Sequence, residues 1–221
     1  MQSSLAQRVR TKKSLSRTKY SRLPRERILI VCEGEKTEVN YFEAIRRFHR
    51  LSSTHICVTY SQLGTSPRKI LESAKECCKN RDNKFDSVFC VFDRDDHKDF
   101  KNAIVECHDI KIKNDLNKRI IFRAIPSVPS FEIWFLMHFR QVTSEIEREK
   151  VLAELKHKYI SEYNKADKNH FGKTRCFLNN AYTNAQKIKN NKIGDDIRNP
   201  YTDVDELVKI LLNMEIASSP S

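Results

Sequence analysis

The chain has 221 residues and a formal net charge of +12, so it is long enough for one well-packed core and basic enough to favour an anionic partner. Its seven cysteines are odd in number and show no C-x-x-C spacing, which argues against a disulfide framework or a zinc site and fits a reduced cytosol. The longest apolar runs, such as ILIVC, are far shorter than the roughly 20 residues of a membrane span, so we expect a cytoplasmic protein without a membrane segment.

Basic residues dominate the N-terminal segment. Residues 1–27 carry nine lysines and arginines, one acid, Glu26, and few apolar residues. Such a segment stays disordered until an anion orders it, and we predict that residues 1–26 form an arm that binds nucleic acid. A solubilising or membrane-surface tail is the alternative, although an amphipathic apolar face is missing. The candidate nucleic-acid residues are Arg8, Arg10, Lys12, Lys13, Arg17, Lys19 and Arg22.

Four apolar segments alternate with amphipathic helices up to residue 125. We predict strands at RILIVCE (27–33), HICVTYSQL (55–63), SVFCVFD (87–93) and RIIFRAI (119–125). Helices are expected from Thr37, as N-cap, from Ser66-Pro67, and from about Phe100. Continuous apolar strands joined by helices indicate a parallel sheet that is covered on both faces.

The pattern changes to helices alone after Pro126. The nearly all-apolar SFEIWFLMHF (130–139) predicts a short buried helix, and Ser144-x-x-Glu147 predicts a capping box that opens the next one. Two more apolar stripes follow, at 177–188 and 204–212. We therefore predict an α/β fold with a four-stranded parallel sheet flanked by helices in residues 27–139, and a C-terminal helical extension packed on it in residues 140–221.

The stretch VCEGEKTE contains Gly34-Glu35-Lys36-Thr37 directly after the first strand, where a phosphate-binding loop of the Walker type would begin. Such a loop needs glycines six and one positions before its lysine, because its backbone N–H groups surround the phosphates. Those positions hold Ile30 and Glu35. The motif is therefore not a Walker loop, and the question becomes what an acid at this strand end does.

Carboxylates follow the first and third predicted strands. Asp93 and Asp95 are two apart, so in extended chain both point to one side, and Glu33 follows the first strand. The carboxyl ends of parallel strands form the ligand-binding edge of an α/β sheet, so these three acids converge if the two strands are neighbours. Clustered carboxylates suit Mg²⁺ or Mn²⁺. Helix capping is the alternative role for such an aspartate.

Four blocks of the sequence, in order, resemble the RloB-like family. They are ILIVCEGEKTEVNYF, VFCVFDRDDH, SFEIWFLMHF and NPYTDVDELVKIL, and the resemblance runs from about residue 22 to about residue 212. The core of that family is similar to a Toprim domain, the catalytic fold that topoisomerases, primases and several nucleases share. The resemblance implies a Toprim-like sheet in which Glu33 is the acid after the first strand, and Asp93 and Asp95 are the D-x-D pair.

The same resemblance implies a Mg²⁺- or Mn²⁺-dependent nuclease in bacterial anti-phage defence of the abortive-infection type, beside an ATPase partner. RNA, including tRNA, is preferred to DNA as the substrate on analogy alone. Glu33 would then be a third metal ligand or a general base, and Lys36 would contact a phosphate. A homo-oligomer is compatible with the sequence.

Two other functions compete with this reading. A non-catalytic nucleic-acid-binding module, working with an ATPase partner, would use the same fold and basic arm. A phospho-receiver domain also clusters acids at strand ends, but it needs a lysine at a later strand end, where this chain has Ile125 and Pro126. Two further roles stay open: His97 is either a proton carrier beside the acids or an exposed residue, and Glu132 either faces the acids or caps its helix.

Overall fold

The computed structural model describes residues 26–80, 84–95, 97–194 and 196–216. The predicted nucleic-acid residues of the arm, from Arg8 to Arg22, lie outside this part of the chain. Arg27, at the start of the described residues, pairs with Asp86 at 3.3 Å and with Asp115 at 2.7 Å. It is therefore bound to the folded core.

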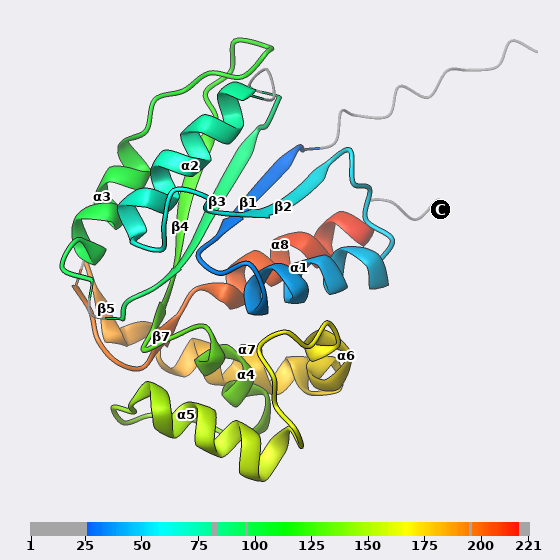
Figure 1. Ribbon diagram of the computed structural model, residues 1–221, viewed down its shortest axis with the longest axis vertical. Coiled ribbons are helices and arrows are strands. Elements are labelled where there is room, and N and C mark those ends of the chain that lie inside the picture. The colour runs from blue at the N-terminus through cyan, green and yellow to red at the C-terminus, as the bar shows by residue number, and fades with distance from the viewer. Residues whose placement is uncertain (1–25, 81–83, 96, 195, 217–221) are drawn as a thin grey trace, which may run out of the picture.

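The fold is built on a mostly parallel sheet (Figure 1). The strands are β1 (Ile28–Cys32), β2 (Ile56–Tyr60), β3 (Ser87–Asp93), β4 (Ile121–Val128), β5 (Lys192–Ile193), β6 (Asp196–Ile197) and β7 (Tyr201–Thr202). The sheet order is β2-β1-β3-β4-β7, in which the first four strands are parallel and β7 is antiparallel to β4. The four predicted parallel strands are confirmed, and the two-residue β7 extends the sheet.

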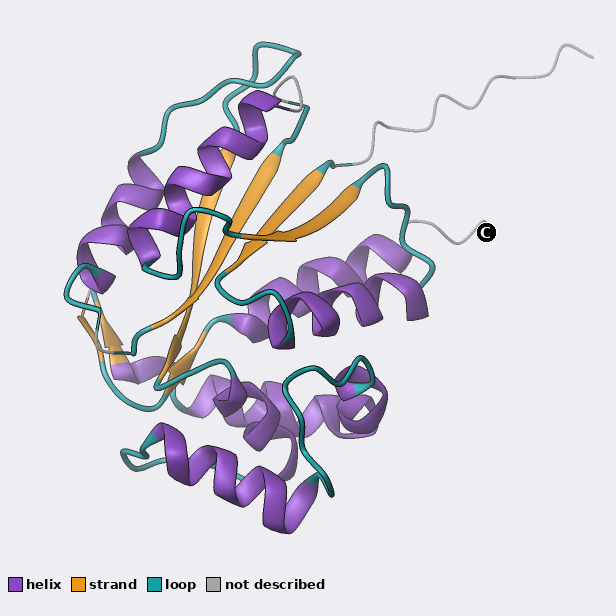
Figure 2. Ribbon diagram, viewed as in Figure 1, coloured by secondary structure: helices purple, strands orange, loops and turns teal. Residues whose placement is uncertain are grey.

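Helices surround the sheet and continue beyond the ends of its strands (Figure 2). They are α1 (Thr37–Phe48), α2 (Pro67–Asn80), α3 (Phe100–Asp109), α4 (Glu132–Phe139), α5 (Arg148–Glu154), α6 (His170–Thr174), α7 (Leu178–Lys187) and α8 (Val204–Ile216). A π-helical turn, η1 (Leu155–Tyr159), follows α5, and 3₁₀ turns η2 (Arg175–Phe177) and η3 (Lys189–Asn191) lie on either side of α7. Among the described residues, no helix combines the length and apolar character needed to cross a membrane.

Alternating side chains of the strands feed two hydrophobic clusters, one on each face. Ile28 and Ile30 pack in a cluster with residues of α1, α4, α7 and α8, whereas Leu29 and Val31 pack with residues of α2 and α3. Both faces are therefore dry, which explains why the strands are apolar throughout rather than alternating. Figure 1 shows α2 and α3 on one side of the sheet and α1 and α8 on the other.

The C-terminal helices share the core of the sheet. Val151, Leu155, Ala181 and Leu207 belong to the same buried cluster as Ile30 of β1. This packing places the loops between those helices beside the carboxyl ends of the parallel strands (Figure 1). The predicted boundary between an α/β core and a helical extension, after residue 139, stays a prediction.

Two predicted helix caps are wrong. Thr37 is the first residue of α1 and not its N-cap, and its hydroxyl donates to the carbonyl of Lys165 at 3.3 Å. The box from Ser144 does not form, because the N-cap of α5 is Glu147 without a side-chain bond. The Asn199 side chain binds the carbonyl of Ile146 at 2.7 Å, so this tertiary contact holds the chain just before the helix.

Candidate metal centre

The acids after β1 and β3 meet because these strands are neighbours. Cys32 pairs with Val91 in the parallel register, and the Glu33 N–H donates to the Val91 carbonyl at 3.0 Å. The Glu33 carboxylate then accepts a hydrogen bond from the Asp93 N–H at 2.9 Å. The predicted convergence of the acids required the first and third strands to be neighbours, and they are. Glu33 therefore contacts the end of β3.

Asp95 reaches the same place by a different route from the one predicted. Strand β3 ends at Asp93, and Asp95 lies in a turn with a φ of 33°, so the two acids are not alternate residues of extended chain. That premise is wrong. The left-handed turn nevertheless brings Asp95 close enough to Glu33 to raise the pKa of that carboxyl, after the larger effect of burial.

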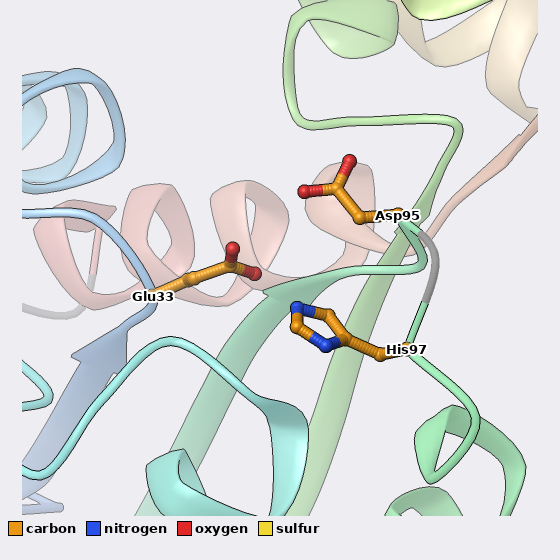
Figure 3. Close-up of side chains that lie close together, drawn as sticks. All are labelled: Glu33, Asp95 and His97. Atoms are coloured by element: carbon orange, nitrogen blue, oxygen red, sulfur yellow. The ribbon is translucent and has the colours of Figure 1, made fainter.

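A histidine joins these acids. Ligand atoms of Glu33, Asp95 and His97 all lie within 4.8 Å of one another. Figure 3 shows the three side chains pointing into one space, Glu33 from the loop after β1 and the other two from the loop after β3. His97 therefore lies beside the acids and is half-buried, and its role as a proton carrier stays a prediction.

Asp93 is buried more deeply than Glu33 and Asp95, the other two predicted metal ligands. The residue is 4% exposed, and its Oδ1 has no hydrogen-bond partner. Burial raises its pKa well above the usual range, and the nearby carboxylates of Glu38, Glu33, Glu132 and Asp95 raise it further. We call these five residues the acid cluster.

Glu38, in the first turn of α1, is a member of this cluster that the sequence analysis missed. It is 7% exposed, and burial together with the carboxylates of Glu132 and Glu33 raises its pKa to about 7. Its side chain folds back over Gly34, where an added Cβ would lie 2.9 Å from the Glu38 Oε2. The glycine of GEKT therefore makes room for a carboxylate rather than for a phosphate.

Glu132, at the start of α4, faces the cluster instead of capping its helix. It is 2% exposed, accepts a hydrogen bond from the Ser130 hydroxyl at 2.7 Å, and pairs with Lys165 at 3.3 Å. Burial alone would raise its pKa, but the opposing charge of Lys165 and the Ser130 bond outweigh burial and lower it. Within the acid cluster, Glu132 is therefore stabilised in its charged form by Lys165 and Ser130.

Two cations from the C-terminal region balance part of this charge. Arg148 pairs with Asp95 at 2.5 Å, and Lys165 pairs with Glu132. Both line a cleft of about 320 Å³ with Glu33, Asp93 and other residues, which we call the acid cleft. Lys36, the exposed residue before α1, also lines this cleft, and its contact with a phosphate stays a prediction.

The family follows from comparison of the whole chain. A model of the RloB-like proteins matches residues 28–211, from the first residue of β1 into α8. The chain belongs to the RloB-like protein family. This confirms the resemblance that its four sequence blocks indicated. No curated protein and no solved structure matches it.

The acid cleft of this RloB-like protein fits a divalent cation. A buried aspartate oxygen without a donor is costly unless a cation compensates it, and Asp93 Oδ1 is such an atom. The surrounding ligands are chiefly carboxylate oxygens, which Mg²⁺ and Mn²⁺ prefer. The ligand atoms that lie close to one another are those of Glu33, Asp95 and His97, and the Asp93 carboxylate is a buried neighbour outside that set. Glu33, Asp93 and Asp95 are the predicted ligands of the ion. The assignment of these residues as ligands stays a prediction.

Some of the missed residues left a signal in the sequence of the RloB-like protein and others did not. Glu38 follows Glu33 in the same loop and helix start, so a search for acids around the end of β1 would have found it. Arg148 and Lys165 lie in unremarkable polar segments far along the chain. Only packing of the C-terminal helices reveals that they line the acid cleft.

Proposed function

We propose that this RloB-like protein is a Mg²⁺- or Mn²⁺-dependent nuclease that hydrolyses phosphodiester bonds of RNA or DNA. The observation that carries the proposal is the acid cluster at the carboxyl ends of β1 and β3, with an unpartnered buried oxygen of Asp93. Like charges that are concentrated in a cleft lower the stability of the folded protein. Such a cluster is therefore typical of a functional site rather than of an interaction that stabilises the fold.

Electrostatics supports a requirement for a metal ion. A phosphodiester is an anion, and the five carboxylates of the acid cluster would repel it. Arg148 and Lys165, which pair with Asp95 and Glu132, offset part of that negative charge. A bound divalent cation supplies the missing positive charge, orients the phosphate and lowers the pKa of a water molecule. Glu33, Asp93 and Asp95 are the residues that would hold it.

Glu33 is suited to accept a proton during hydrolysis. One oxygen is oriented by the Asp93 N–H at 2.9 Å, and burial raises the pKa of the carboxyl towards the pH at which a general base is most effective. The alternative role as a direct metal ligand uses the same position. Lys36, at the rim of the cleft, would contribute one charged contact to the phosphate.

The biological setting is part of the proposal. The resemblance to RloB-like proteins implies a role in bacterial anti-phage defence of the abortive-infection type, in the cytoplasm and beside an ATPase partner. A nuclease in that role must be restrained in a healthy cell, so the partner is the expected regulator. RNA, including tRNA, is the preferred substrate, and DNA is the alternative.

The test compares wild type with Asp93→Asn and with Asp109→Asn, an exposed aspartate on α3 that serves as the control. Each protein is incubated with labelled tRNA, mRNA and plasmid, with Mn²⁺ or with EDTA, and with or without the co-expressed ATPase. We expect cleavage by wild type and Asp109→Asn in Mn²⁺ only, and none by Asp93→Asn.

Calorimetric titration with Mn²⁺ tests the site without depending on cleavage. Affinity should fall strongly in Asp93→Asn and in the double variant Glu33→Gln/Asp93→Asn. Equal cleavage by wild type and Asp93→Asn would reject the metal-nuclease mechanism. Nucleic-acid binding without cleavage by any protein, with or without the ATPase, would support a non-catalytic binding module instead.

A further inference from the structure

A second cleft adjoins the acid cleft and shares one residue with it. This cleft has a volume of about 540 Å³, and its lining includes Leu152, Ala153, Lys156, Glu162, Tyr163 and Asn164. Lys165 lines both clefts. The two clefts therefore meet at the ammonium of Lys165, which lies in a loop and not in a strand or a helix.

The loop that carries this lysine, residues 160–169, is held at the start of α1 by its backbone; we call it the Lys165 loop. The Thr37 hydroxyl donates to the Lys165 carbonyl at 3.3 Å, and the Asn40 side chain donates to the Ala166 carbonyl at 3.2 Å. The carbonyl of Asn164, the residue before Lys165, lies 2.9 Å from the His170 Nε2. Three successive carbonyls are thus fixed, so the Lys165 loop is placed in advance of any ligand.

The Lys165 side chain is placed but still accessible. Its Nζ lies 3.3 Å from Glu132 Oε1, yet the side chain is 45% exposed while that of Glu132 is 2% exposed. Tyr163 on the same loop donates its hydroxyl to Glu132 at 3.3 Å. The buried carboxylate thus orients both residues, and the ammonium keeps donors free for a phosphate at the boundary of the two clefts.

The size and lining of the second cleft indicate its ligand. A volume of about 540 Å³ lies in the range of small-molecule sites, roughly 300 to 1,000 Å³, and suits one nucleotide. An aliphatic wall of Leu152 and Ala153 suits the face of a base, and Lys156 and Asn164 offer polar contacts. A base can enter such a cleft only when it is unpaired and unstacked.

We propose that the Lys165 loop binds a single unpaired nucleic-acid strand, with Lys165 on a backbone phosphate and the adjoining nucleoside in the second cleft. This deepens the proposed function and rests on it in one respect only, namely that the bond to be cut lies in the acid cleft. The inference concerns binding, so it can be tested where no cleavage occurs.

The experiment measures fluorescence anisotropy of a labelled single-stranded RNA oligonucleotide, and of the same strand in a duplex, in EDTA over a range of salt concentrations. The variants are Lys165→Gln, Lys165→Arg and Ala153→Leu, which narrows the second cleft without changing charge or adding an aromatic face. Lys69→Gln on α2 is the control, because Lys69 is 49% exposed and also pairs with a glutamate. Thermal unfolding checks that each variant is folded.

Lys165→Gln should weaken binding of the single strand about ten-fold and reduce the log–log salt slope by about 0.7, the values expected for one charged contact to a phosphate. Lys165→Arg should bind within a few-fold of wild type. Ala153→Leu should weaken binding about ten-fold with little change in salt slope, because it occupies the space of the base and changes no charge. Wild type should bind the duplex more weakly than the single strand, and Ala153→Leu should leave duplex binding unchanged.

Binding by Lys165→Gln and Ala153→Leu at the wild-type level would overturn this inference, even if wild type cleaves RNA in Mn²⁺. A duplex preference in wild type would overturn the claim of an unpaired strand. If the variants lose binding as expected but wild type cleaves nothing with the ATPase present, the inference stands and the nuclease proposal falls. The two failures are therefore distinguishable.

Discussion

Replacing Glu38 with glutamine should make the metal-free protein more stable at neutral pH. Burial and the neighbouring carboxylates raise the pKa of Glu38 from 4.5 to about 7. As the pH rises from 4.5 to 7, the unfolded chain releases a proton that the folded chain retains, so the folded state loses stability over this interval. At 1.36 kcal/mol per pKa unit, the loss amounts to about 3 kcal/mol and is complete somewhat above pH 7.

Glutamine carries no charge in either state, so Glu38→Gln should escape this loss. In EDTA at pH 8, the variant should be more stable than wild type by up to about 3 kcal/mol, or by about 6 to 12 °C in Tm for a chain of this size. At pH 4.5 and below the two proteins should be close in stability. The exposed Glu76→Gln on α2 is the matched control and should follow wild type at every pH.

Unfolding in urea at several pH values, with EDTA present, measures these differences. Mn²⁺ at 100 times its Kd should then narrow the difference, because it adds about 2.7 kcal/mol to wild type and less to a variant that lacks one carboxylate. The reasoning is refuted if Glu38→Gln is less stable than wild type in EDTA at pH 8 and its stability changes with pH as that of wild type does.

Three further changes test other parts of the molecule. Gly34→Ala places a Cβ 2.9 Å from the Glu38 Oε2 and should lower Mn²⁺ affinity several-fold with an intact fold, as calorimetry can show; unchanged affinity would mean that Glu38 has no part in the site. Lys189→Met removes an ammonium that two buried carboxylates share, at 2.5 Å from Asp203 and 2.9 Å from Asp205. Lys209 stays beside Asp205, and the change should cost about 3 kcal/mol in urea unfolding because both buried acids lose a common cation; a cost below 1 kcal/mol would contradict this. Deleting residues 1–22 should flatten the log–log salt dependence of nucleic-acid binding by several units, at about 0.7 to 0.9 per phosphate contact, and an unchanged slope would assign the arm another role.

The elements of the sheet could be predicted from local sequence because their physical cause is local. SVFCVFD forms β3 over the predicted residues, and Ser66-Pro67 opens α2 at Pro67, as a proline in the first turn of a helix predicts. An apolar run bounded by helices can be stable only between two dry faces. The parallel sheet and the edge at which its acids gather therefore followed from hydrophobic patterning.

The helix starts were less predictable because distant groups compete for the capping side chains. Thr37 has the residue type of an N-cap, but its hydroxyl binds the carbonyl of Lys165, a residue far along the chain. The extended arrangement expected for Asp93 and Asp95 failed for a related reason. The chain leaves β3 in a turn, and Asp95 pairs with Arg148 of α5.

By itself the sequence determined which residues are apolar, charged or helix-forming, and so the strands, most helices and the acids after β1 and β3. It also determined the family, because the order of its blocks is a property of the sequence. The tertiary structure alone decided which side chains meet. Arg148 and Lys165 reach the acid cleft because one buried cluster packs the C-terminal helices against the sheet, and no local pattern records such long-range packing.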